Sequence, residues 1–169
     1  MSNTSKGGPR EPHYITRKGA RAMQDELVEL RVKQRPKIVQ DVADAAAQGD
    51  RSENAEYKYG KQKLREIDRR IHYLTKRLET GTVVGALDRE GAALDRVFFG
   101  AVVDVEDDDG KASTYEIVGA DEIDLTRGRI SYRSPPGRAL LKRQVGETVI
   151  FQRPSGEAEL TILGIRYEE

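Results

Sequence analysis

The sequence predicts an α+β protein in which an antiparallel two-helix coiled-coil hairpin precedes a small α+β domain. Helical periodicity dominates residues 14–81, whereas short β-like runs separated by turn signals fill residues 82–169. The charge divides in the same way. Residues 1–80 hold 18 Lys+Arg and 12 Asp+Glu, a net +6, and residues 81–169 hold the remaining 11 and 17, a net −6. We therefore predict a disordered leader over 1–13 and two modules with different partners.

The composition excludes several classes of protein. Of the 169 residues, 34% are charged and 37% hydrophobic, which favours a shape with much surface per residue over one compact sphere. There is no Cys and there are only two His, so disulfide scaffolds, thiolate metal sites and histidine-rich zinc sites are excluded. No apolar run approaches about 18 residues, and the N-terminus lacks the apolar part of a secretory signal, so we expect a cytoplasmic protein.

The first helical pattern opens at Thr16. Pro36 lies inside it and should kink or locally break the helix. The pattern ends near Gly49, which is typical of a C-terminal cap. Its apolar positions recur at spacings of three and four, with a phase slip near the proline. They are Ala20, Met23, Leu27, Leu30, Ile38, Val42 and Ala45.

The second helical pattern is a heptad seam that stops near Gly81. Its positions are Tyr57, Gly60, Leu64, Ile67, Ile71, Leu74 and Leu78. Because only about four residues, Gly49 to Ser52, join the two patterns, the helices must run back against each other. With roughly 30 residues each at 1.5 Å per residue, the hairpin should be about 45 Å long.

Two acids, Asp50 and Glu53, lie at the end of this hairpin. Their spacing fits a capping box, with Asp50 as the N-cap of the second helix. It also fits a role with Mg²⁺, which prefers carboxylate oxygens. Two carboxylates on an exposed tip cannot complete a metal site alone, so the remaining ligands would come from a partner. The spacing does not choose between the two roles.

The loop residues carry a family resemblance. The run from Gly49 to Tyr57 and the run from Lys63 to Arg70 resemble the GreA/GreB transcript cleavage factors, with the closer similarity to the GreB members. The resemblance extends from Tyr14 to Tyr167. Further motifs match in the same order, namely Val97–Ala101, Ile117–Gly119 with Asp121-Glu122, Ser134-Pro135, Arg138–Lys142 and Val145-Gly146.

The resemblance implies a transcription elongation factor that is not itself an enzyme. Its hairpin would enter the secondary channel of bacterial RNA polymerase, and an FKBP-like C-terminal domain would dock on the rim of the channel. Asp50 and Glu53 would be the catalytic pair, sharing a Mg²⁺ with the polymerase to support cleavage of backtracked RNA. The implied partners are the polymerase and the RNA 3′ end. The resemblance also implies DNA binding, no contact with a membrane, and a monomeric protein. Arg133, before Ser134, departs from the family pattern.

A basic strip follows the seam one residue later along the second helix. It consists of Lys58, Lys61, Arg65, Arg69, His72 and Lys76, and is widened by Lys63 and Arg70. Such a strip is commonly a solvated coiled-coil flank. With the resemblance, it is expected to hold RNA phosphates. The RNA contacts we expect nearest the acids are Arg51, Lys58 and Lys61, with Arg65 and Arg69 reached by longer fragments.

Residues 82–169 predict a mainly antiparallel sheet with one short helix. The expected strands are Val97–Val105, Tyr115–Val118, Ile130–Tyr132, Val149–Phe151 and Leu160–Tyr167, and the helix is Arg138–Lys142. The acidic turn Asp107–Gly110 lacks the later ligands of a calcium loop, so a hairpin turn is predicted. The loop before the helix supplies the candidate polymerase-docking residues Ser134, Pro135 and Arg138.

Three alternatives to cleavage stimulation stay open from the sequence. A factor with the same architecture could occupy the polymerase channel as an inhibitor. A coiled-coil adaptor would use the tip acids only as helix caps. A stand-alone prolyl isomerase is suggested by the fold analogy alone, which is weak support for an activity.

Overall fold

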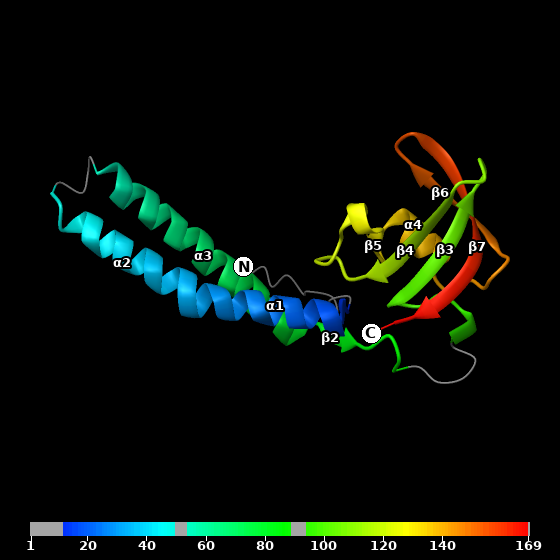
Figure 1. Ribbon diagram of the computed structural model, residues 1–169, viewed down its shortest axis with the longest axis horizontal. Coiled ribbons are helices and arrows are strands. Elements are labelled where there is room, and N and C mark those ends of the chain that lie inside the picture. The colour runs from blue at the N-terminus through cyan, green and yellow to red at the C-terminus, as the bar shows by residue number, and fades with distance from the viewer. Residues whose placement is uncertain (1–11, 50–53, 89–93, 169) are drawn as a thin grey trace, which may run out of the picture. The chain divides into compact units, whose positions relative to one another are not determined.

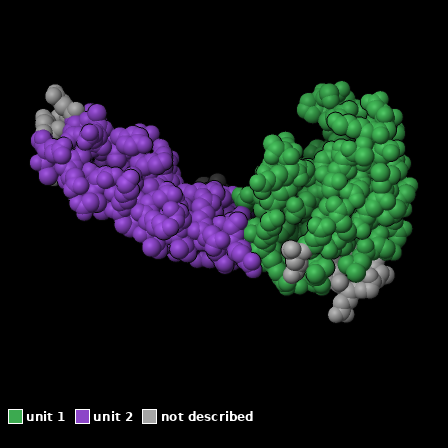
Figure 2. Space-filling model, in the orientation of Figure 1, with its two compact units in different colours: residues 1–19, 81–169 green, residues 20–80 purple. Residues whose placement is uncertain are grey.

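The computed structural model describes residues 12–49, 54–88 and 94–168. The chain forms two compact units, one of residues 20–80 and one that joins residues 1–19 to residues 81–169 (Figure 2). Within the predicted hairpin domain, residues 14–81, the first residues group with the C-terminal part of the chain, to which Tyr14 and Thr16 are hydrogen-bonded.

The predicted hairpin helices are present (Figure 1). The first helical run comprises α1 (Arg17–Glu29), the π-helical segment η1 (Leu30–Gln34) and α2 (Arg35–Ala46), and the second is α3 (Ala55–Thr80). Both stripes predicted from periodicity face inward. In α3 every second seam residue is buried and those between are half-buried, as expected when one helix covers another. The fully buried seam residues are Gly60, Ile67 and Leu74.

The irregularity predicted at Pro36 is confirmed, as a π-helical turn directly before it. Pro36 has no N–H for the carbonyl of Val32, and its ring crowds that carbonyl. The helix widens there, and the N–H of Arg35 donates to the carbonyl of Leu30, five residues back. The run thus continues past the proline instead of ending.

A short two-stranded parallel sheet lies at the start of the first helical run. Strand β1 (Tyr14–Thr16) pairs with β2 (Thr82–Val84). Thr16 then caps α1, because its Oγ1 accepts from the N–H of Gly19 at 2.9 Å. The helix start predicted at Thr16 is confirmed, but strand β1 was not predicted.

The carboxylate of Glu122 is buried against this helix start. It accepts hydrogen bonds from the N–H of Thr16 and the N–H of Gly119, both at 3.0 Å, and from the Thr16 hydroxyl. Arg129 lies 3.5 Å away and compensates the buried charge. A Cβ on Gly19 would lie 2.1 Å from the Glu122 carboxylate, so any larger residue there must displace that carboxylate.

The larger sheet has five strands in the order β5-β4-β3-β7-β6. They are β3 (Ala101–Asp107), β4 (Ala112–Val118), β5 (Arg129–Ser131), β6 (Thr148–Arg153) and β7 (Gly156–Tyr167). All neighbouring pairs are antiparallel except β4 with β5, which is parallel. The prediction of β-structure from Val97 was wrong over its first residues. Residues 97–100 are a buried connection that turns at Gly100, where φ is 87°.

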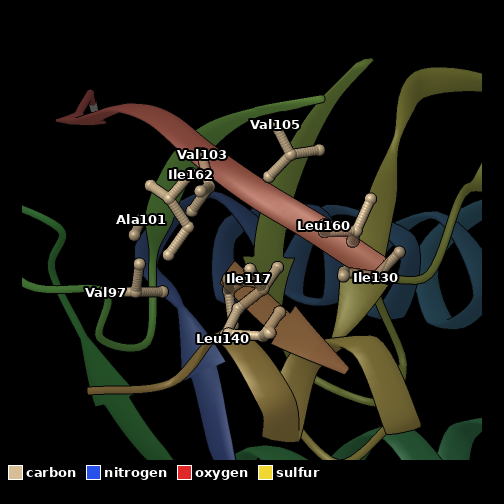
Figure 3. Packing of buried hydrophobic residues seen from close by; sticks show 10 residues of the cluster. Val97, Ala101, Val103, Val105, Ile117, Ile130, Leu140, Leu160 and Ile162 are labelled. Carbon is tan, nitrogen blue, oxygen red and sulfur yellow. The ribbon is translucent and has the colours of Figure 1, made fainter. Parts of the chain in front are cut away.

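The core of this domain lies where the sheet meets α4 (Pro135–Leu140) (Figure 3). Val97, Val103, Ile117, Leu140 and Ile162 are fully buried in it. The 3₁₀ turn η3 (Leu125–Arg127) precedes β5. The predicted helix over 138–142 is confirmed in place but begins three residues earlier, because Ser134 is its N-cap. No helix within the described residues is long and apolar enough to cross a membrane.

Candidate functional site

The loop end of the hairpin is formed by the last turn of α2 and the first turn of α3. After α2 ends at Ala46, the N–H of Ala47 still donates to the carbonyl of Ala43 at 3.2 Å. Gly49 then has φ of 136°, a backbone conformation that side chains disfavour. The helix end predicted near Gly49 is confirmed, and it fixes where the loop departs.

Asn54 is the N-cap of α3. Its Oδ1 accepts from the N–H of Tyr57 at 3.0 Å, and its carbonyl accepts from the N–H of Lys58 at 3.1 Å. Its Nδ2 donates to the carbonyl of Ala45 in α2 at 2.7 Å. One side chain therefore starts the second helix and joins it to the end of the first.

The predicted tip acids Asp50 and Glu53, and the predicted RNA contact Arg51, lie outside the described residues. Their roles as catalytic residues, metal ligands and RNA contact stay predictions. Within the described residues the N-cap bond of α3 comes from Asn54, and an Asn directly before a helix is a local cap signal that the capping-box interpretation did not consider.

The predicted basic strip is exposed along α3. Lys58, Lys61, Arg65 and Arg69 are all exposed, as are His72 and Lys76. Within the part of the chain that the structure describes, no ion pair or side-chain hydrogen bond involves the first four. Their charges are therefore available to a polyanion, which is the property that the RNA prediction requires.

Two residues predicted to widen the strip have other contacts. Arg70 donates from Nε and from a terminal nitrogen to the carboxylate of Glu26, at 2.7 and 2.9 Å, and its guanidinium lies over the ring of Tyr73. Lys63 is 3.9 Å from Glu66. Arg70 is thus committed to joining the helices, and the strip is narrower than predicted.

Ion pairs between the helices lie on the part of the hairpin away from the loop. The hydrogen bond from Arg70 holds the pKa of Glu26 below its ordinary value, although partial burial opposes this effect. Arg35 donates to Asp68 at 2.7 Å, and this contact raises the pKa of the guanidinium. Both pairs are exposed, so solvent screening keeps the contribution of each to stability small.

The predicted docking residues lie together at the start of α4. Ser134 is the N-cap: its Oγ accepts from the N–H of Gly137 at 3.2 Å and donates to the carbonyl of Ser131 at 2.6 Å. Pro135 and Arg138 are exposed. The Ser134 hydroxyl has a structural role, which leaves the other two as the accessible part of the predicted docking surface.

The acidic turn between β3 and β4 is a hairpin turn, as predicted. One carboxylate oxygen of Asp107 accepts from the N–H groups of Asp109 and Lys111, at 3.0 and 2.8 Å. Gly110 has φ of 77°. Among the described residues, one cluster brings three carboxylates close enough to hold a metal ion: Asp107, Asp108 and Asp109. The turn itself explains why these side chains lie together.

The sequence matches two family models that together cover most of the chain. Residues 13–83 match the N-terminal domain of the transcription elongation factors, and residues 92–167 match the C-terminal domain of the transcription elongation factors GreA and GreB. The division between the models agrees with the division between the helical hairpin and the sheet domain.

Individual relatives are similar over nearly the whole chain. The transcription elongation factor GreB of Neisseria meningitidis serogroup B is 51% identical over 155 residues, which are 92% of this chain and 94% of the relative. The GreB of Haemophilus ducreyi is 47% identical over 156 residues, which are 92% of this chain and 94% of the relative. The crystal structure of GreA factor homolog 1 of Thermus thermophilus is 23% identical, with a TM-score of 0.41 over 92% of this chain and 99% of that one. From the two family models and the identity to the GreB factors, the chain belongs to the GreA/GreB family of transcription elongation factors.

Proposed function

We propose that this protein stimulates hydrolytic cleavage of backtracked RNA by bacterial RNA polymerase and so rescues arrested complexes. The observation that carries the proposal is the 51% identity to a GreB factor over 92% of the chain, together with the family model that matches residues 13–83. The hairpin would enter the secondary channel and bring Asp50 and Glu53 to the polymerase active site. The protein would act as an accessory factor, while the polymerase catalyses the hydrolysis.

The two carboxylates require ligands from the polymerase, because a pair of side chains cannot complete the coordination of Mg²⁺. When bound, Mg²⁺ supplies activation of the attacking water and stabilisation of the leaving oxygen. This chain contributes the positioning of the two carboxylates. Asn54 holds the end of the loop to both helices, so that the two carboxylates are delivered from a fixed base.

The exposed cations on α3 would hold the displaced RNA. Lys58 and Lys61 follow the loop within two turns of helix, and Arg65 and Arg69 continue the line. Successive cations at this spacing suit the phosphates of a single strand. Longer extruded RNA would therefore use more of the strip. Pro135 and Arg138 would contact the channel rim.

A stalled, backtracked polymerase complex with labelled RNA tests the proposal. The wild-type protein should shorten the RNA in the presence of Mg²⁺, and Asp50→Asn with Glu53→Gln should still bind the polymerase yet lose most of the stimulation. Asp25→Asn with Glu79→Gln, which changes two exposed carboxylates elsewhere on the hairpin, is the matched control and should stimulate normally. Full stimulation by the tip variant would contradict the proposal, and binding without any stimulation by the wild type would favour the inhibitor.

A further inference from the structure

A groove lies between α2 and α3 on the loop side of the hairpin. Its volume is about 470 Å³. It has an apolar floor, with Ala45 and Gly60 buried and Ile38 half-buried. Tyr59, whose residue is 68% exposed, stands beside it. The remaining lining residues are Asp41, Asp44, Gln48, Ala55 and Glu56.

The three carboxylates of the groove have no cationic partner within the described residues. Asp44 accepts one hydrogen bond, from the amide of Gln40 at 2.8 Å. Asp41 and Asp44 also lie in the final turns of α2, which has no basic residue in its last turn. Acids at a helix C-terminus oppose the negative end of the helix dipole. The arrangement is locally unfavourable, and a cation seated in the groove would relieve it.

The groove and the basic strip are on opposite flanks of α3. At about 100° per residue, Lys58 and Lys61 point roughly 160° away from Glu56 and Tyr59, with the seam between them. RNA phosphates held by the strip would be repelled from the groove. The two flanks of the loop end therefore suit partners of opposite charge.

We propose that this groove receives a Lys- or Arg-bearing segment of RNA polymerase when the hairpin is inserted. The inference rests on the proposed function, since insertion brings a protein wall against this flank. The carboxylates attract the cationic head, the apolar floor accepts its aliphatic stem, and the ring of Tyr59 offers a face for the cation. The strip would then hold RNA on one flank while the groove holds protein on the other.

The test neutralises the groove without changing its shape, with Asp41→Asn, Asp44→Asn and Glu56→Gln in one variant. Three exposed charge pairs lost together should weaken binding to backtracked polymerase about tenfold and flatten its salt dependence. The matched control changes three other exposed carboxylates of the hairpin, in Asp25→Asn, Glu66→Gln and Glu79→Gln. It should bind within about twofold of wild type. The probe is the purified backtracked complex, titrated into labelled factor at two salt concentrations.

A photoreactive residue in place of Gln48 identifies the occupant. It should cross-link to a polymerase peptide that contains Lys or Arg, and a cross-link to RNA instead would overturn the inference. Equal affinities of the groove variant and the control would also overturn it. The melting temperature of the groove variant should not fall, because neutralisation removes repulsion, and a fall would contradict uncompensated charge at this site. RNA cleavage by the wild-type protein, measured alongside, reports on the proposed function separately.

Discussion

Replacing Asn54 with alanine removes two hydrogen bonds at the loop end of the hairpin. The first is the N-cap bond to Tyr57 at 3.0 Å, and loss of such a cap costs about 1 kcal/mol. The second is the bond to the carbonyl of Ala45 at 2.7 Å, whose loss costs roughly 1 kcal/mol because Ala45 is buried. We expect Asn54→Ala to lower the free energy of unfolding of the hairpin by about 2 kcal/mol in total.

A second variant separates the two bonds. Asn54→Ser retains an oxygen that can cap α3, but it has no amide to reach the carbonyl of Ala45. Its cost should therefore be about half that of alanine, or ~1 kcal/mol. Gln62→Ala, which alters an exposed polar residue of the same helix, is the control and should change stability by less than about 0.5 kcal/mol.

Urea denaturation followed by the helical circular dichroism signal measures these differences. The same variants should be compared in RNA cleavage at a temperature where all of them are folded. We expect Asn54→Ala to stimulate cleavage less than Asn54→Ser, because the loop base is then held to neither helix. If serine and alanine are equally destabilising, the bond to Ala45 is the main one and capping is minor. If alanine matches wild type, Asn54 does not organise the loop end.

Three further predictions concern the strip, the ion pairs and the buried carboxylate. Lys58→Glu with Lys61→Glu should weaken cross-linking of the factor to RNA severalfold without lowering its melting temperature, because both residues are exposed and unpaired. Glu26 has a lowered pKa in the folded protein, so its contribution to stability is complete above about pH 4.5 and is lost as the pH falls through the folded value. The stability advantage of wild type over Glu26→Gln, measured by urea denaturation, should shrink accordingly. Gly19→Ala should destabilise the protein by about 2 kcal/mol in the same assay, since the new methyl displaces Glu122.

Each of these has a contrary outcome that is easy to recognise. Reversal of two exposed cations elsewhere on the hairpin, Arg21→Glu with Lys37→Glu, controls for net charge, and an equal loss of cross-linking would remove the strip from the RNA path. A stability difference for Glu26→Gln that is independent of pH would mean that packing, not charge, supplies the contact. A stabilising Gly19→Ala, as helix propensity alone predicts, would show that the site can relax.

The helical hairpin could be predicted because its stabilising contacts are local and periodic. The heptad seam places Ile67 and Leu74 inward with no further information. The effect of Pro36 was also visible, because a missing N–H perturbs the preceding turn wherever the helix lies. The sequence did not show, however, that a π-helical turn would accommodate the missing N–H, so that the helix continues past the proline.

The contacts that periodicity missed are those between residues far apart in the sequence. Strand β1 has three residues and exists because β2, 68 residues later, pairs with it. The role of Glu122 depends on the N–H groups of Thr16 and Gly119, of which the first is 106 residues away. In the sequence, Glu122 is part of a motif that carries the family resemblance, but nothing local shows that its carboxylate binds Thr16. At the loop end, Asn54 was readable as a cap from its place directly before the helix.

Charge along the hairpin is arranged in two ways, and the difference bears on function. Away from the loop, cations and anions of opposite helices neutralise each other, as in Arg70 with Glu26 and Arg35 with Asp68. On the loop side of Arg35, no ion pair joins the helices within the described residues. There the strip collects cations on one flank and the groove collects anions on the other.

This arrangement does not favour the isolated protein. Like charges repel each other along both flanks, and the anions also oppose the dipole of α2. Exchanging a few of these residues would create helix-to-helix pairs like those away from the loop, so the sequence is capable of the more favourable pattern. Natural sequences break local rules of this kind mainly at functional surfaces. A loop end without helix-to-helix ion pairs on either flank is therefore expected of a surface whose charges are paired in a complex.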